Sequence, residues 1–283
     1  MAALLALLSS VLWGTSDYLG GTVSRRLPVL SVLGVQQSFA VLGLVPLALV
    51  LGAFAEPRAY VLPAVLAGLV GLASLACFYR ALALGTMGVV APIAALGVVV
   101  PVVVALLDGE QPGALRLVGI AVAVVGVVLA SGPELSGRAG AQPLLLAAVS
   151  GVGFGVVCVL VAAASDGRGV DAVVMTLLTM RLSTVTLLLV ALLALAPRRG
   201  VGLGVRRPDL PVLATIGAFD VGANGAYALA AQSDLVSVAA VLASLYPVVT
   251  VLLARRFHAE RLAGVQLVGV TAALVGVVLL AGG

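Results

Sequence analysis

Long runs of hydrophobic residues follow one another along the chain, separated by short polar breaks. A helix that crosses a bilayer needs roughly 20 mostly apolar residues, and the pattern predicts ten such helices. The breaks leave no room for a soluble domain, so the predicted fold class is all-α integral membrane, with ten transmembrane helices. The predicted helices cover residues 2–20, 29–53, 60–84, 88–107, 114–131, 142–163, 172–195, 210–231, 235–254 and 262–281.

Composition supports a membrane protein. Hydrophobic residues make up 63% of the 283 residues and charged residues 9%, which leaves too little polar surface for a water-soluble fold. All fifteen basic residues are arginines, and most lie in the short breaks. There they suit contact with anionic lipid headgroups rather than nucleic acid. Cys77 and Cys158 are isolated in apolar runs and predict neither a disulfide framework nor a metal site.

The sequence contains an internal repeat near the end of each half. Residues 110–132 align without gaps on residues 260–282, with eleven identical positions 150 residues apart. A weaker echo sets Trp13-Gly14 against Phe154-Gly155 near the start of each half. The positions that raise the alignment above shared composition are Glu110 and Glu260, Gly119 and Gly269, Gly126 and Gly276, and Gly132 and Gly282.

The repeat predicts how the two halves are related. Five helices are an odd number, so a duplicated second half enters the membrane from the opposite side. Residues 1–141 and 142–283 are therefore predicted to be inverted five-helix repeats. The repeated glycines are seven residues apart, which places them on one helix face, and small residues on one face let helices approach closely. We expect the fifth and tenth helices to pack against each other through these glycines.

Several segments resemble a known family. They are WGTSDYLGG in the first predicted helix, FYRALALGTMGVVAPIAALG across the third and fourth, and the helices that follow Glu110 and Glu260. Together with the length and the duplication, they resemble the EamA family of the drug/metabolite transporter superfamily over the whole chain. The resemblance implies a central cavity between the halves. It also implies transport of a small metabolite, an amino acid or a related solute, across the cytoplasmic (inner) membrane, often by export.

The arginines predict an orientation. Ten fall in breaks on one side of the predicted bundle, and Arg58, Arg116 and Arg168 fall on the other. The positive-inside rule makes the side with ten arginines cytoplasmic, and with ten helices this leaves both termini outside. The family resemblance implies both termini inside, so the two predictions disagree.

Asp220 is the main candidate for a functional acid, because it lies near the middle of the eighth predicted helix. A charged side chain at that depth costs about 2.5–3.5 kcal/mol on insertion scales. Asn224 and Tyr227 follow at helical spacing and share its face. Two interpretations stay open: a wall of the substrate cavity, in which Asp220 exchanges a coupling proton, or a buried structural ion pair.

Arg181 in the seventh predicted helix and Arg80 in the third are the basic candidates. Either could pair with Asp220 or bind an anionic group of a substrate. Arg80 lies about one turn from its helix end, so its side chain could instead extend to the membrane interface.

Three further residues are predicted to line the cavity. Trp13 and Asp17 share one face of the first helix, where they could also anchor that helix at the interface. Gln37 lies in the second helix, and its alternative role is a hydrogen bond between helices. Pro92 interrupts the fourth helix as Pro247 interrupts the ninth, and matched interruptions point toward a binding site, although helix packing could also explain them.

These observations predict a secondary transporter and not an enzyme. No ATP-binding loop of the G-x-x-x-x-G-K-[ST] type occurs, so an ion or solute gradient would drive transport. No cofactor or metal is expected, and the expected partners are a small solute and membrane lipids. The alternatives are a flippase for lipid-linked sugars and a membrane-embedded enzyme that modifies lipids. The enzyme is disfavoured because the eleven acidic residues are scattered singly.

Overall fold

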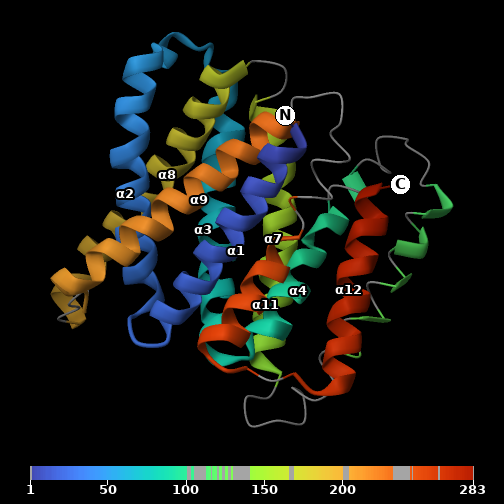
Figure 1. Cartoon of the computed structure of the whole chain (residues 1–283). Coiled ribbons are helices and arrows are strands. Elements are labelled where there is room, and N and C mark those ends of the chain that lie inside the picture. The colour runs from blue at the N-terminus through green and yellow to red at the C-terminus, as the bar shows by residue number, and fades with distance from the viewer. Residues whose placement is uncertain are drawn as a thin grey trace.

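The structure is a computed structural model that describes residues 2–100, 141–165, 169–199, 204–231, 245–260 and 262–282, with isolated positions between 103 and 129 and residue 243. These residues form a bundle of α-helices (Figure 1). The α-helices are α1 (Ala2–Ser24), α2 (Val29–Leu51), α3 (Val61–Leu84), α4 (Met87–Ala95), α7 (Gln142–Ser165), α8 (Gly169–Arg199), α9 (Leu210–Ala231), α11 (Tyr246–Phe257) and α12 (Gly264–Gly282). Short 3-10 helices are η1 (Ala53–Ala55), η2 (Arg58–Tyr60), η3 (Leu96–Val98) and η4 (Arg207–Asp209).

The all-helical membrane fold expected from the sequence is confirmed. Five helical segments are long and apolar enough to cross a membrane: Val29–Leu51, Arg58–Leu84, Gln142–Ser165, Gly169–Ala191 and Arg207–Ala230. In α12 the apolar stretch Gly264–Gly276 is shorter. Part of the predicted fifth helix and the start of the predicted ninth lie outside the described residues. The count of ten transmembrane helices therefore stays a prediction.

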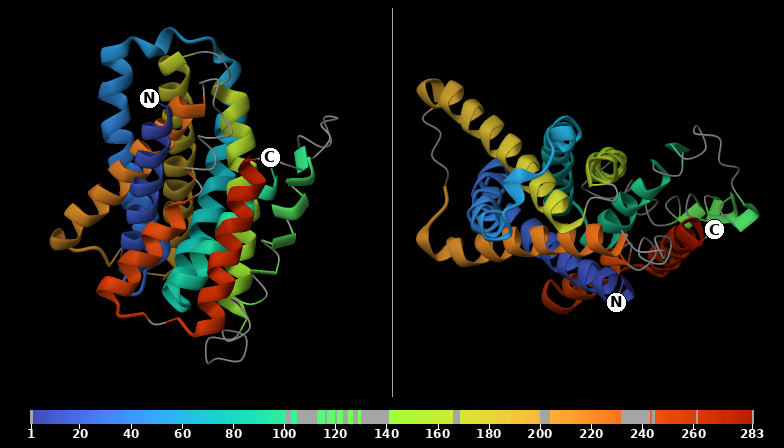
Figure 2. Two further views of the ribbon diagram at one scale, coloured as in Figure 1. Left: turned by 45° about the vertical axis from the view of Figure 1, so that its right-hand side comes forward. Right: turned by 90° about the horizontal axis from the view of Figure 1, so that it is seen from above.

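Corresponding helices of the two halves run in opposite directions, as inverted repeats require. In Figures 1 and 2, α1 runs downward from the N-terminus and α7 runs upward. Contacts agree with this arrangement. Helix α3 runs in the same direction as α1, and α7 is antiparallel to α3, because α3 ends where α7 begins. A Cβ atom added to Gly85, at the end of α3, would lie 2.8 Å from Pro143 Cβ at the start of α7. Ala64, near the start of α3, belongs to the same core cluster as Ala164 near the end of α7.

The packing between the halves also follows the repeat. The most extensive helix contacts are α3 with α7 and α1 with α9, two pairs that the repeat exchanges. Gly14 and Gly155, which correspond in the repeat, each lie where two helices come very close together. A Cβ atom on Gly14 would lie 2.6 Å from Val249 Cβ in α11, and one on Gly155 would lie 2.6 Å from Val100 Cβ at the end of the α4 segment. Glycine is needed at both places because each half presses a first helix against the fourth helix of the other.

The predicted contact between the fifth and tenth helices is confirmed at Gly126. A Cβ atom there would lie 2.7 Å from the carbonyl oxygen of Gly269 and 2.8 Å from the Cα atom of Ala273, both in α12. Backbones can approach this closely only where side chains are small.

Pro92 lies inside the fourth helix, as predicted, but it does not line the cavity described below. It is buried in α4. Four residues later α4 tightens into η3, where a Cβ atom on Gly97 would collide with the backbone of Gly151 in α7. The interruption of this helix therefore serves close packing, and the prediction that Pro92 lines the site is corrected.

Helices α1 and α11 end, and α9 begins, toward the lower part of the bundle in Figure 1, and most of the arginines near helix ends lie in these segments. Two ion pairs join these segments: Arg25 with Glu260, and Arg26 with Asp209. The opposite end carries Arg58, in η2. We call the first the arginine-rich end; it is defined by Arg25, Arg26, Arg206, Arg207, Arg255 and Arg256.

The arginine-rich end is predicted to face the cytoplasm. Phe257, next to Arg256, and Phe54, in η1 near Arg58, are exposed phenylalanines at opposite ends of the bundle. In a background with Cys77 and Cys158 changed to alanine, Phe54→Cys should react with an impermeant maleimide on intact cells. Phe257→Cys should react only after the membrane is opened. The reverse pattern would place the arginine-rich end outside and contradict the positive-inside prediction.

Candidate substrate cavity

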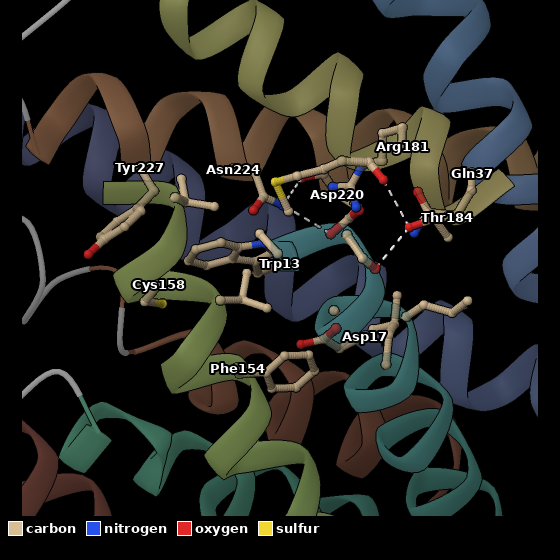
Figure 3. A pocket seen from close by; sticks show the side chains of 18 of the residues that line it. Trp13, Asp17, Gln37, Phe154, Cys158, Arg181, Thr184, Asp220, Asn224 and Tyr227 are labelled. Carbon is tan, nitrogen blue, oxygen red and sulfur yellow. Dashed lines mark hydrogen bonds and ion pairs between the residues drawn. The ribbon is translucent and has the colours of Figure 1, made fainter. Parts of the chain in front are cut away.

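A polar cavity lies where the two halves meet. Its volume is about 150 Å³. Helices α1, α2 and α3 of the first half and α7, α8, α9 and α11 of the second contribute its walls (Figure 3). Its polar and aromatic lining residues are Trp13, Asp17, Gln37, Phe154, Arg181, Thr184, Asp220, Asn224, Tyr227 and Tyr246.

An ion pair joins α8 to α9 on one wall. Arg181 Nη2 lies 2.6 Å from Asp220 Oδ2, and the two side chains are 8% and 15% exposed. Asn224, one turn along α9, donates its amide N–H to Asp220 Oδ1 at 3.2 Å. The polar stripe predicted on this helix is therefore a wall of the cavity. Its basic partner is Arg181, because Arg80 is exposed.

Arg181 also offers a donor that the ion pair leaves unused. The residue is 6% exposed, and its Nε atom is buried without a hydrogen-bond partner in the described part of the chain. Gln37 is 2% exposed, and its Oε1 atom likewise has no partner there. An unpaired buried polar group costs about 1–3 kcal/mol. A donor and an acceptor are thus left unpaired on residues that line one small cavity, where a polar solute could pair with them.

Asp17 is a second carboxylate in the cavity. Its side chain lies one turn from Trp13 on α1 and the residue is 8% exposed. The ion pairs formed by the described residues do not include it. Because Asp220 already faces Arg181, Asp17 is the acid of this cavity that lacks such a counter-charge.

Three aromatic rings come together beside Asp17. The ring centroid of Trp13 lies 5.7 Å from that of Tyr227 and 6.3 Å from that of Tyr246, the latter in an edge-on arrangement. Ring faces attract cations within about 6 Å of their centroid. Asp17 and this aromatic cluster are therefore suited to a positively charged group.

Small residues of α3 let α8 come close enough to complete the wall. A Cβ atom on Gly68 would lie 2.5 Å from the carbonyl oxygen of Met180, one residue before Arg181. The hydroxyl of Thr184, one turn beyond Met180, donates to the carbonyl of Gly68 at 3.0 Å. These contacts fix the depth at which Arg181 enters the cavity.

Two of the predicted lining residues, Arg80 and Pro92, are not in the cavity lining, and several residues that do line it were not predicted. Arg80 does not line the cavity; it is exposed near the end of α3, consistent with a side chain that extends to the interface.

Thr184 and Tyr246 were missed because single hydroxyls in apolar helices carry no distinctive spacing. Phe154 was visible only as the counterpart of Trp13 in the repeat. Gln36, the neighbour of Gln37, accepts a hydrogen bond from the Tyr79 hydroxyl at 3.3 Å instead of facing the cavity.

Metal chemistry finds no support in the described residues, where no group of three or more histidine, cysteine or acidic side chains is close enough to hold an ion. His258 is the single histidine of the chain. It is partly buried, with Nε2 3.3 Å from the Thr22 hydroxyl and its ring 5.1 Å from that of Tyr18.

An all-helical membrane protein with a polar cavity between two halves is the architecture of a solute transporter. The model of the EamA-like transporter family matches residues 1–132 and again residues 142–282, so the chain belongs to this family. It is a secondary transporter, and the family is one of transporters, not of enzymes. The fold is similar to a solved chain described as "Crystal structure of protein", with a TM-score of 0.64 and 18% identity, over 98% of this chain and 95% of that chain. No curated protein matches the sequence.

The ion pair predicts an asymmetric effect of mutation on stability. Asp220→Asn should lower the stability of the purified protein by about 3–5 kcal/mol, because it leaves the Arg181 charge buried without a partner. The double change Asp220→Asn with Arg181→Met should recover most of this loss, because no buried charge remains. Thermal unfolding in detergent measures both. If the double variant is no more stable than Asp220→Asn alone, the stability lost in Asp220→Asn does not come from breaking the ion pair.

Proposed function

We propose that this protein moves a small zwitterionic metabolite, an amino acid or a close relative, across the cytoplasmic membrane. The observation that carries the proposal is the arrangement of charge in the cavity. Arg181 lines the cavity and has an Nε donor without a partner among the described residues, while Asp17 lacks a counter-charge and lies beside three aromatic rings. The carboxylate of the solute would bind Arg181 and its ammonium group would bind Asp17.

Size supports a small solute over the alternatives. A volume of about 150 Å³ suits a molecule of amino-acid size, whereas ligand pockets for larger molecules span about 300–1,000 Å³. A lipid-linked sugar would need that larger space. A lipid-modifying enzyme that uses a metal and a diphosphate would need clustered acids, and the two acids of this cavity are not clustered with further ligands. Export as the direction of transport rests on the family resemblance.

We assign proton coupling to Asp17 rather than to Asp220. Asp220 already has a counter-charge, because the guanidinium of Arg181 lies 2.6 Å from its carboxylate. Asp17 has no such partner among the described ion pairs, so protonation would remove an uncompensated charge from the membrane interior. A solute ammonium group would compete with the proton for the same carboxylate.

The binding role of Arg181 is tested by a matched pair of arginine variants. At equal amounts of folded protein, because the change also leaves Asp220 buried without its partner, Arg181→Gln should lower amino-acid exchange in proteoliposomes by at least about tenfold, since a charged hydrogen bond contributes about 1.5–3 kcal/mol. Arg80→Gln is the control, because that arginine is exposed and outside the cavity. A panel of amino acids, amines and carboxylic acids identifies the class of solute. Equal loss in both variants, or transport confined to uncharged solutes, would overturn the proposal.

The coupling assignment predicts that Asp17→Asn loses accumulation driven by a pH gradient. Solute exchange should be weakened, because the ammonium group loses its partner, and the exchange that remains should no longer depend on pH. Asp220→Asn should instead reduce the yield of folded protein. Both are measured in the same proteoliposomes, at equal amounts of folded protein. If Asp17→Asn accumulates solute with unchanged pH dependence, Asp17 does not carry the proton. If only Asp220→Asn loses that dependence, the coupling site is Asp220.

A further inference from the structure

Glu260 connects the two halves at the arginine-rich end, although it precedes α12 in sequence. Its Oε1 atom accepts from Arg25 Nη2 at 3.2 Å and from the backbone N–H of Met87 at 3.3 Å, and its Oε2 atom accepts from the N–H of Gly88 at 3.2 Å. Met87 and Gly88 are the first residues of α4. One carboxylate thus binds the start of α4 and the end of α1, both in the other half of the chain.

The loop that carries Glu260 is held in an unusual shape. Ala259 has a φ angle of 52°, in the left-handed region that residues other than glycine and asparagine seldom adopt. Such strain persists only where surrounding contacts impose it. Leu262 covers the other side of the junction, because a Cβ atom on Gly88 would lie 3.0 Å from its Cδ2 atom.

His258 packs in the same junction without adding charge. Burial, and next the nearby guanidinium of Arg25, lower the pKa of His258 below its usual value, while Glu260 acts in the opposite sense. The imidazole is therefore neutral at pH 7. The charge that faces Glu260 comes from Arg25 and from the helix N-terminus of α4, which carries a partial positive charge.

A packed layer separates the cavity from this junction. Phe78, Leu82 and Met87 are fully buried there. A Cβ atom on Gly21, one turn beyond Asp17 in α1, would lie 2.7 Å from Leu82 Cβ. The cavity is therefore sealed from the arginine-rich end by α1, α3 and α4, and Glu260 binds the ends of two of these three helices.

We propose that Glu260 is a latch that keeps the arginine-rich end closed, and that its contacts with α4 and Arg25 break when the cavity opens toward that end. The proposal rests on the protein being a transporter whose cavity opens to alternate sides. It does not depend on which solute is carried. Two charge-assisted hydrogen bonds to a helix N-terminus and one ion pair meet on a single side chain, so removing that side chain releases both helices together.

The test measures access to a buried cysteine on each side of the cavity. Leu82 and Ala64 are both fully buried in α3, the first toward the arginine-rich end and the second toward the opposite end. Each is changed to cysteine in full-length protein with Cys77 and Cys158 replaced by alanine, and maleimide reaction rates are measured in proteoliposomes. Glu260→Ala should raise the rate at position 82 by about tenfold or more. The rate at position 64 should stay the same or fall.

Three outcomes would overturn the latch. They are an unchanged rate at position 82, an equal rise at both positions, which indicates general loosening, and the same rise in Arg256→Gln. Arg256 is the control because it is exposed in the same region and contacts the Phe257 ring rather than Glu260.

Exchanging the two charges tests whether the contact of Glu260 with α4 or only its ion pair with Arg25 keeps this end closed. The double variant Arg25→Glu with Glu260→Arg restores opposite charges but places a cation at the N-terminus of α4. It should remain as reactive at position 82 as Glu260→Ala. Recovery of slow reaction would show that the ion pair alone closes this end.

Glu260→Gln, which keeps the size and one carbonyl acceptor, should give an intermediate rate at position 82. It replaces Glu260→Ala in the test if the alanine variant does not fold. The accessibility assay uses no solute, so a failed latch and a wrong solute class give different results.

Discussion

A single arginine and a single aspartate face each other in the apolar interior, and the site is organised around the need to neutralise both. Neither charge could be buried at this depth alone. Their pairing fixes α8 against α9, orients Asn224 toward the aspartate and leaves the Arg181 Nε atom as an unused donor. Asp220 therefore has a counter-charge and Asp17 does not, because the one arginine of the cavity lining is already paired with Asp220. The two side chains are chemically identical, but Asp220 has a structural role, and Asp17 has a proposed role in binding and coupling.

Close backbone packing is what makes so small a polar cavity possible. Without a hydrophobic driving force between helices in lipid, small residues let helices gain contact area by direct approach. Gly14 and Gly155 do this at two places that the repeat relates, and Gly68 does it beside Arg181. The same packing closes the arginine-rich end below Asp17. A cavity sealed by packed helices opens only if those helices move, and this is why contacts at the helix ends matter for transport.

The sequence predicted those features that depend on local spacing. Hydrophobic runs located the helices, and the i, i+4, i+7 spacing of Asp220, Asn224 and Tyr227 placed all three on one cavity wall. Features that depend on how each helix is rotated about its axis could not be predicted. Arg80 and Pro92 were expected in the cavity, but α3 turns the first outward and α4 packs the second against neighbouring helices. Glu260 shows the same limit, because it lies between α11 and α12 in sequence while the helix it binds is α4.

The central claim is that the solute binds in the cavity beside Trp13, which is the only tryptophan of the chain. Its fluorescence therefore reports on the site without any label. Titration of purified protein with the amino acids that it transports should change the emission of Trp13 saturably, and Arg181→Gln should weaken that response while Arg80→Gln leaves it intact. Transported solutes that leave the emission unchanged, or a response equally weakened in both variants, would contradict binding at this site.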